Sequence, residues 1–106
     1  MAEYAQTGAA TWFYPGARAD FAFRCEGDCM EPLFRAGDLA LIRRQETFSD
    51  GEVIAVRIKG VELLKRAYKT PLGIFFTMDN AKYIPFIREE REVEVLGIAV
   101  GRVAES

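Results

Sequence analysis

Residues able to do chemistry are few in this chain, and they gather in three short stretches. The chain has two cysteines and no histidine, so histidine-activated nucleophiles and histidine-ligated metal sites are excluded, and four-cysteine zinc sites are excluded as well. Catalysis would need lysine, a carboxylate or tyrosine as its proton carrier, and we expect no metal or cofactor. The three stretches are Gly27-Asp28-Cys29-Met30-Glu31-Pro32 followed by Gly37-Asp38, then Leu63-Leu64-Lys65-Arg66, then Asp79-Asn80-Ala81-Lys82-Tyr83-Ile84-Pro85.

Composition narrows the class of protein further. The 106 residues carry 14 basic and 16 acidic side chains, and half are apolar, which suits one domain with a real core. A net charge of −2 argues against nucleic acid as the direct partner of this chain. No apolar run is long enough to cross a bilayer and no signal peptide precedes the domain, so we expect a cytoplasmic protein with reduced thiols.

The elements that must position the three stretches are predicted to be strands. Alternating apolar residues and turn signals favour a mostly β fold with little or no helix. A hairpin is expected at Lys59-Gly60, one helical turn over residues 30–34 after Asp28 as N-cap, and a bulge or close backbone approach at Gly97 and Gly101. The expected strands are residues 21–25, 39–43, 53–58, 61–68, 74–78 and 93–103.

Residues 1–20 differ in composition from the domain that we expect over residues 21–106. Small residues with Gly8 and Pro15-Gly16 indicate an irregular arm, held to the body by the aromatic residues 12–14. Within the domain, Cys25 lies on a predicted strand and is expected in the core, and residues 89–94 form an exposed loop or edge.

Taken in order, the three stretches resemble the C-terminal domain of the LexA, UmuD and phage-repressor family of self-cleaving peptidases. The resemblance extends over residues 21–103 and rests on a GDSM-E-P turn, a downstream GD pair, a strand lysine followed by arginine, and an N-P-x-Y segment. Two positions depart from it, because Cys29 stands where the family has its catalytic serine and Ala81 where it has proline. The matching positions besides Lys65 are Gly27, Met30, Pro32, Gly37, Asp38, Asn80 and Tyr83.

The resemblance implies Cys29 as nucleophile, Lys65 as general base, and the amides of Asp28 and Cys29 as oxyanion donors. A lysine is a base only when neutral, which desolvation favours. Lys65 would share a strand face with Leu63 and Val61, which is compatible with desolvation. A thiol ionises more readily than a hydroxyl, so the pair could also rest as thiolate and ammonium, which costs the base its neutral form.

The same resemblance implies a substrate bond, usually Ala-Gly, in the chain itself before the nucleophile. The only Ala-Gly here is Ala36-Gly37, inside the expected domain, and Gly8-Ala9-Ala10 is a weak alternative. The sequence therefore reads as the product left after cleavage, or as a segment trimmed to the C-terminal domain, without a helix-turn-helix. Implied partners are a second copy through residues 95–103, the RecA–single-stranded-DNA filament of the SOS response, and operator DNA through an absent N-terminal domain, with no membrane.

Two other functions fit the same fold. One is a catalytically inactive dimerisation module of a prophage regulator, and the other is a UmuD-like subunit of a translesion polymerase. A leader peptidase uses similar chemistry but needs a membrane anchor, which this sequence lacks.

Overall fold

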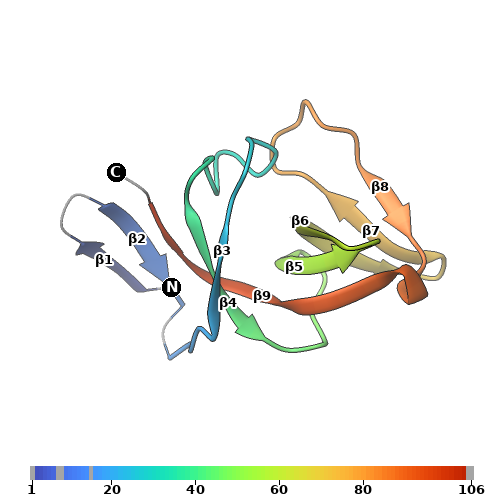
Figure 1. Cartoon of the computed structure of the whole chain (residues 1–106), viewed down its shortest axis with the longest axis horizontal. Helices are drawn as coiled ribbons and strands as arrows, with labels where there is room; N and C mark the ends of the chain where they lie inside the picture. Colours follow the sequence, from blue (N-terminus) through green and yellow to red (C-terminus); the bar gives the residue numbers. More distant parts are fainter. Residues whose placement is uncertain (1, 7–8, 15, 105–106) are drawn as a thin grey trace.

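The computed structural model describes residues 2–6, 9–14 and 16–104, and this part of the chain is nearly all β (Figure 1). The 3₁₀ turn η1 (Glu90–Glu92) is the single helical element among these residues. The predicted mostly β fold is therefore confirmed. The strands are β1 (Ala2–Gln6), β2 (Ala9–Phe13), β3 (Phe21–Arg24), β4 (Leu39–Arg44), β5 (Glu52–Ile58), β6 (Val61–Thr70), β7 (Gly73–Thr77), β8 (Phe86–Arg88) and β9 (Val93–Val103).

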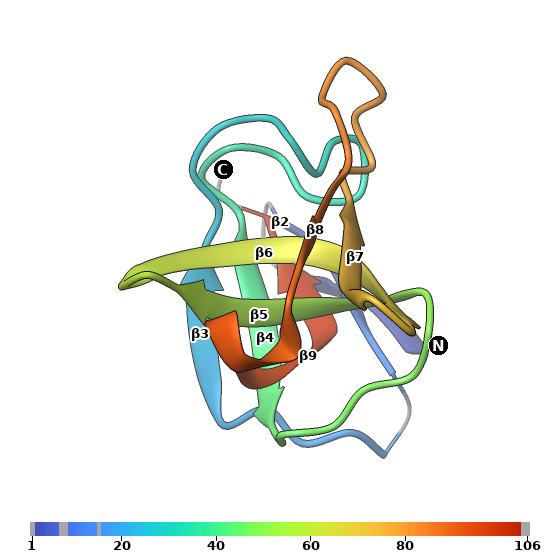
Figure 2. The same cartoon turned by 90° about the vertical axis from the view of Figure 1, so that its right-hand side faces the viewer.

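The strands form one antiparallel sheet that curls around the long strand β9. Its order is β1-β2-β9-β5-β6-β7-β8, while β4 also pairs with β9 and β3 pairs with β4. Figure 2 shows the β3–β4 connection and the β7–β8 connection rising at the same end of the molecule, above β6. This arrangement brings the first and third stretches of the sequence together. Among the described residues, no helix has the length and apolar character needed to span a bilayer.

Local sequence signals account for most of the predicted elements. The β5–β6 hairpin turns at Lys59-Gly60, whose φ angles of 51° and 79° are those of a primed turn that matches the twist of the strands. One helical hydrogen bond, from the Phe34 amide to the Met30 carbonyl (2.9 Å), confirms the predicted turn. The three-residue strand β8 was not predicted.

The prediction of an irregular arm is wrong for residues 2–6 and 9–13, which form strands, whereas residues 14 and 16–20 are irregular as predicted. Strands β1 and β2 pair with each other, and β2 continues the sheet by pairing with β9, with Trp12 opposite Arg102. The alanine-rich segment has little intrinsic strand propensity, so the hydrogen bonds between β2 and β9 are what stabilise it as a strand. Gly8 of the weak Gly8-Ala9-Ala10 cleavage candidate and Pro15 of the predicted arm lie outside the described residues.

Two apolar clusters cover opposite faces of β5. Val53 and Ala55 face a cluster that contains Cys25, as predicted, while Ile54 and Val56 face the other. The expected close approach at Gly97 is confirmed, because a Cβ there would lie 2.3 Å from a backbone carbonyl oxygen of β4. Register shifts in both the β4–β9 and β5–β9 pairings bend β9 between the two clusters.

The segment predicted as the dimer face lies at the centre of this sheet. Residues 97–101 are buried within the chain, and their edges pair with β4, β5 and β2. Only the ends of the predicted segment, near Val95 and Arg102, have partly exposed side chains. Dimerisation stays a prediction.

Candidate active site

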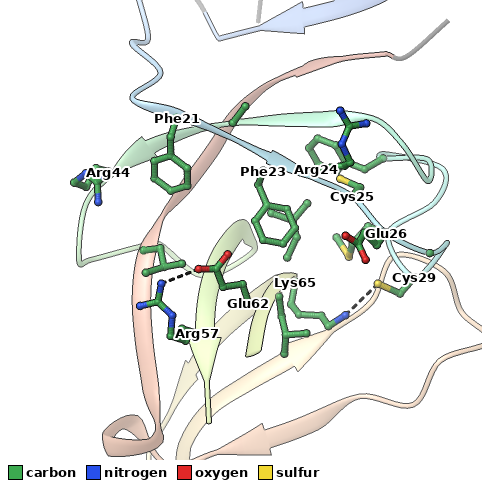
Figure 3. Close-up of a pocket in the computed structure, with 17 residues that line it drawn as sticks. Phe21, Phe23, Arg24, Cys25, Glu26, Cys29, Arg44, Arg57, Glu62 and Lys65 are labelled. Atoms are coloured by element: carbon green, nitrogen blue, oxygen red, sulfur yellow. Dashed lines mark hydrogen bonds and ion pairs between the residues drawn. The ribbon is translucent and has the colours of Figure 1, made fainter. Parts of the chain in front are cut away.

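Cys29 and Lys65 are in contact although 36 residues separate them. Cys29 lies in the β3–β4 connection and Lys65 in the middle of β6, and the Lys65 Nζ donates to the Cys29 Sγ at 3.0 Å (Figure 3). Both side chains are partly buried, and the thiol is free. Of the two residues expected to shield the lysine, Leu63 is partly buried but Val61 is 56% exposed, so the strand face alone does not desolvate the amine.

The turn that carries Cys29 is anchored in the core by the side chains of Met30 and Phe34. Gly27 adopts a φ of 84°, which only glycine reaches without strain, and so bends the chain just before the cysteine. Met30 and Phe34 are 3% and 0% exposed and anchor the helical turn that follows. The Cys29 amide donates no hydrogen bond to any other described residue, so it is free to donate to an oxyanion.

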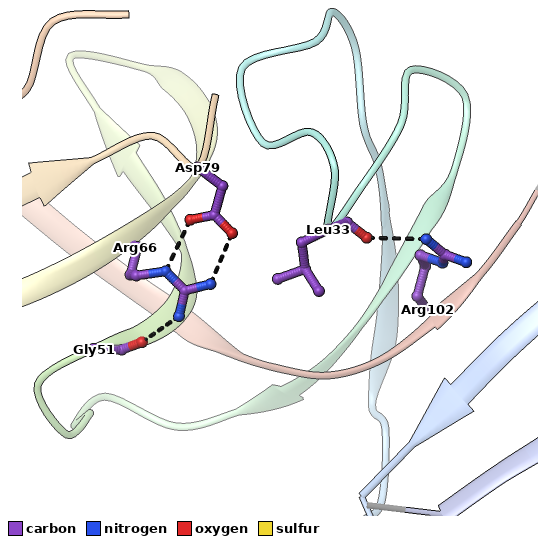
Figure 4. Close-up of polar contacts among 5 residues, drawn as sticks. All are labelled: Leu33, Gly51, Arg66, Asp79 and Arg102. Atoms are coloured by element: carbon purple, nitrogen blue, oxygen red, sulfur yellow. Dashed lines mark hydrogen bonds and ion pairs between the residues drawn. The ribbon is translucent and has the colours of Figure 1, made fainter. Parts of the chain in front are cut away.

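The Gly37-Asp38 pair closes the same connection at its other end. The buried Asp38 carboxylate accepts a hydrogen bond from the Arg35 amide (2.8 Å) and lies 3.8 Å from the Arg102 Nε. Arg102 also donates to the Leu33 carbonyl at 3.1 Å (Figure 4). Arg102 was missed because its place on β9 is remote in sequence from the turn that it supports. These contacts indicate that Asp38 supports the turn that carries Cys29.

The third stretch, residues 79–85, binds the nucleophile turn through hydrogen bonds and an ion pair. Asn80 donates twice to the turn, from its backbone amide to the Cys29 carbonyl and from its side chain to the Asp28 carbonyl, both at 3.0 Å. The Asp28 carboxylate pairs with the Lys82 Nζ at 2.8 Å and accepts a hydrogen bond from the Tyr83 hydroxyl. The Lys82 ammonium, and after it the Tyr83 hydroxyl, hold the pKa of Asp28 below its ordinary value. The predicted motif residues Asn80 and Tyr83 therefore position the turn.

An ion pair that the sequence did not reveal joins the third stretch to β6, the strand that carries Lys65. Arg66 donates to both carboxylate oxygens of Asp79 at 2.8 Å and also to the Gly51 carbonyl (Figure 4). The two charged side chains are 29% and 17% exposed, and the Asp79 hydrogen bond raises the pKa of the guanidinium. Because Arg66 follows Lys65 and Asp79 precedes Asn80, the pair couples the position of the base to that of the nucleophile turn.

Cys29 and Lys65 lie at one end of a cleft of about 680 Å³ between β3 and β6 (Figure 3). Within the described chain, β4 is the one strand that pairs with β3, and residues of β3 line the cleft. A second cavity of about 340 Å³ lies against the same pair, beside Met78 and Tyr83. Cys29 and Lys65 line both cavities. Side chains that line the large cleft include Phe21, Phe23, Arg24, Glu26, Arg44, Arg57, Glu62 and Leu64.

The two cysteines have different environments. Cys25 is 6% exposed, and burial, with a further contribution from the Asp38 carboxylate and then Cys29, raises the pKa of its thiol to about 11. Cys29 instead lines both cavities. No cluster of three or more potential metal ligands occurs in the described part of the chain.

Comparison with known proteins agrees with this geometry. The chain matches the family described as Peptidase S24-like over residues 3–100. It belongs to that family. The predicted family is therefore confirmed, and the chain is a LexA-like S24 peptidase domain.

Several LexA repressors are similar to this S24-like domain. The repressor of Citrifermentans bemidjiense is 36% identical over 84 residues, which is 76% of this chain and 42% of the repressor. The repressor of Geotalea uraniireducens is 34% identical over the same lengths, and that of Shewanella woodyi is 28% identical over 92 residues, 84% of this chain and 44% of the repressor. The chain spans about two fifths of the length of these relatives.

Proposed function

We propose that this S24-like domain is the self-cleaving peptidase domain of a LexA-type repressor, with Cys29 as nucleophile and Lys65 as general base. The observation that carries the proposal is the 3.0 Å contact between the lysine Nζ and the cysteine Sγ, two residues that line both cavities. Family membership supports the peptidase class, and the resemblance of the motifs supports the assignment of the two roles.

The chemistry uses one proton carrier throughout. The neutral Lys65 amine takes the proton of the Cys29 thiol, and the thiolate attacks the carbonyl carbon of the scissile bond. The Cys29 amide donates to the oxyanion that forms. The tetrahedral intermediate then expels the amine product, which receives the proton from the Lys65 ammonium. A water molecule, deprotonated by the same amine, hydrolyses the thioester and frees the thiol.

The shape of the cleft suits an extended peptide. In the described chain β3 has a partner strand on one side only, so a peptide in the cleft can be added to the sheet as a further strand beside β3. Apolar side chains of Phe23 and Leu64 line the same cleft and would contact alternate side chains of that peptide. A segment on the N-terminal side of Cys29 in the same protein is the proposed substrate.

The test is to follow the complete reading-frame product by mass spectrometry at pH 7 to 10, together with its C29A, C29S and K65A variants. We expect cleavage upstream of residue 29 in the parent protein, faster at higher pH, and none in C29A or K65A. K65R keeps the positive charge but provides no neutral amine, and it should also stay intact. Cleavage of K65A at the parental rate would refute the assignment of the base.

A second function is favoured by the departure at position 29. A sulfur atom in a site shaped for a serine oxygen misplaces the reacting atom, and small displacements are costly in rate. A UmuD-like polymerase subunit is a separate candidate, which a short upstream arm in place of a DNA-binding domain would favour. The alternative favoured by the cysteine is a catalytically inactive dimerisation module of a prophage regulator. An intact parent protein together with a cleaving C29S variant would identify the cysteine as an inactivating substitution and favour this alternative.

Likeness to the LexA repressors also supports a proposal for partners. We propose a homodimer, cleavage stimulated by the RecA–single-stranded-DNA filament, and operator contacts made by a domain outside this chain. Sedimentation at high micromolar concentration tests the dimer, and a monomer there would count against it. Cleavage rates with and without the filament test the stimulation.

A further inference from the structure

We propose that the contact between Cys29 and Lys65 is also a modification site, at which hydrogen peroxide links the two side chains through a sulfur–nitrogen bond. The proposal does not depend on peptidase activity. It requires a thiol that an oxidant can reach and an amine close enough to capture the oxidised sulfur. The peptidase mechanism requires neither the oxidation of the thiol nor the capture of the oxidised sulfur by the amine.

The thiol meets the first requirement. Cys29 is partly exposed and faces both cavities, so a small oxidant in solvent reaches its sulfur. Peroxide oxidises the thiolate form of a cysteine. The Lys65 Nζ donates a hydrogen bond to the sulfur that would react.

The amine meets the second requirement better than the other thiol does. A sulfenic acid condenses with a nearby thiol or nitrogen, so Cys25 and Lys65 compete for the oxidised Cys29. Cys25 is buried and its thiol pKa is about 11, which leaves it protonated and a poor nucleophile at neutral pH. The Lys65 Nζ already lies 3.0 Å from the sulfur (Figure 3). The geometry therefore favours the amine.

The two steps balance with peroxide as the only oxidant. The Lys65 amine first takes the proton of the thiol. The Cys29 thiolate attacks hydrogen peroxide, the O–O bond breaks, and sulfenic acid and hydroxide form. The hydroxide takes the proton back from the Lys65 ammonium, which gives one water and the neutral amine. The neutral Lys65 amine then attacks the sulfur, so that an S–N bond forms, the S–O bond breaks, and water leaves with a proton from the nitrogen. In total, a thiol, an amine and one peroxide give the link and two waters. Two equivalents of an external thiol reverse it, restoring the thiol and the amine and forming an external disulfide.

The link would remove the proposed nucleophile and base together and would join the β3–β4 turn covalently to β6. The test treats the purified folded chain with hydrogen peroxide and measures its mass. We expect a product that lacks two hydrogen atoms, peptide maps that join the peptides of Cys29 and Lys65, loss of tryptic cleavage after Lys65, and reversal by dithiothreitol. Cleavage activity is not measured, so failure of the link is distinct from failure of the proposed function.

Three controls separate the link from other oxidation products. C25S should still form it, while K65R should lose it and retain a sulfenic acid that dimedone traps. Chain unfolded in urea should not form it, because 36 residues then separate the two groups. A product that is lost in C25S but kept in K65R would be a disulfide and would overturn the proposal. Oxidation only to sulfinic or sulfonic acid would overturn it as well.

Discussion

Replacing Arg66 by methionine should lower the free energy of unfolding more than the loss of an exposed ion pair would. The substitution keeps the apolar stem but removes two hydrogen bonds to the Asp79 carboxylate, each 2.8 Å long, and one to the Gly51 carbonyl. Breaking a fully buried pair costs about 3–5 kcal/mol, and one hydrogen bond to a charged group contributes about 1.5–3 kcal/mol. Because the two side chains are 29% and 17% exposed, we expect a loss of about 2–3 kcal/mol in the free energy of unfolding, between these values.

Arg57→Met is the matched control. Arg57 also binds two carboxylate oxygens at 2.7 and 2.8 Å, but they belong to Glu62 and Glu94, and these side chains are 39–61% exposed. Exposed pairs contribute little to stability, because solvent screens the charges and the side chains lose entropy on pairing. The two variants thus remove the same chemical group from environments that differ in burial.

The assay is urea denaturation of both variants beside the parent chain, with thermal unfolding as a second measure. For a domain of this size each kcal/mol corresponds to roughly 4–8 °C in Tm, so R66M should unfold about 10–20 °C lower. If the pair also couples the base to the nucleophile turn, the cleavage rate of folded R66M falls below that of the parent protein. Equal losses of stability in the two variants would refute the reasoning from burial.

Three further predictions concern single positions. At pH 8, iodoacetamide should label Cys29 in the folded chain, whereas Cys25, with a thiol pKa of about 11, should react only after unfolding; equal labelling by peptide mapping would contradict this. Gly97→Ala should cost about 2–3 kcal/mol by urea denaturation, because its Cβ would lie 2.3 Å from a carbonyl oxygen of β4. Lys82 lowers the pKa of Asp28, so their pairing stabilises the fold above the unfolded-state pKa and is lost as pH falls through the folded-state value. K82M should therefore be less stable than the parent at neutral pH but equally stable at the lowest pH, and an unchanged difference across pH 2–7 would contradict this.

Local patterns predicted the elements that carry their own signals. Alternation found the main strands, the Lys59-Gly60 turn placed the hairpin, and Gly97 marked a close approach. Strands β1, β2 and β8 were not predicted, because they depend on pairing with other strands (β1 with β2, β2 with β9, and β8 with β7) rather than on residue type. The Arg66–Asp79 pair was missed for the same reason, since nothing local links a strand arginine to a turn aspartate 13 residues later.

The sequence by itself determined which chemistry is possible and which family the chain resembles. Without histidine, an activated nucleophile needs another base, and the order of the three stretches singled out Cys29 and Lys65. Only the tertiary structure decided that the Lys65 Nζ and the Cys29 Sγ lie 3.0 Å apart. It also decided that Cys25 is buried whereas Cys29, four residues later, is partly exposed. Cys25 follows β3 with its side chain in the core, whereas Cys29 sits in a turn at the mouth of a cleft. Burial and contact arise from pairing between strands far apart in the chain, and residue type alone does not encode them.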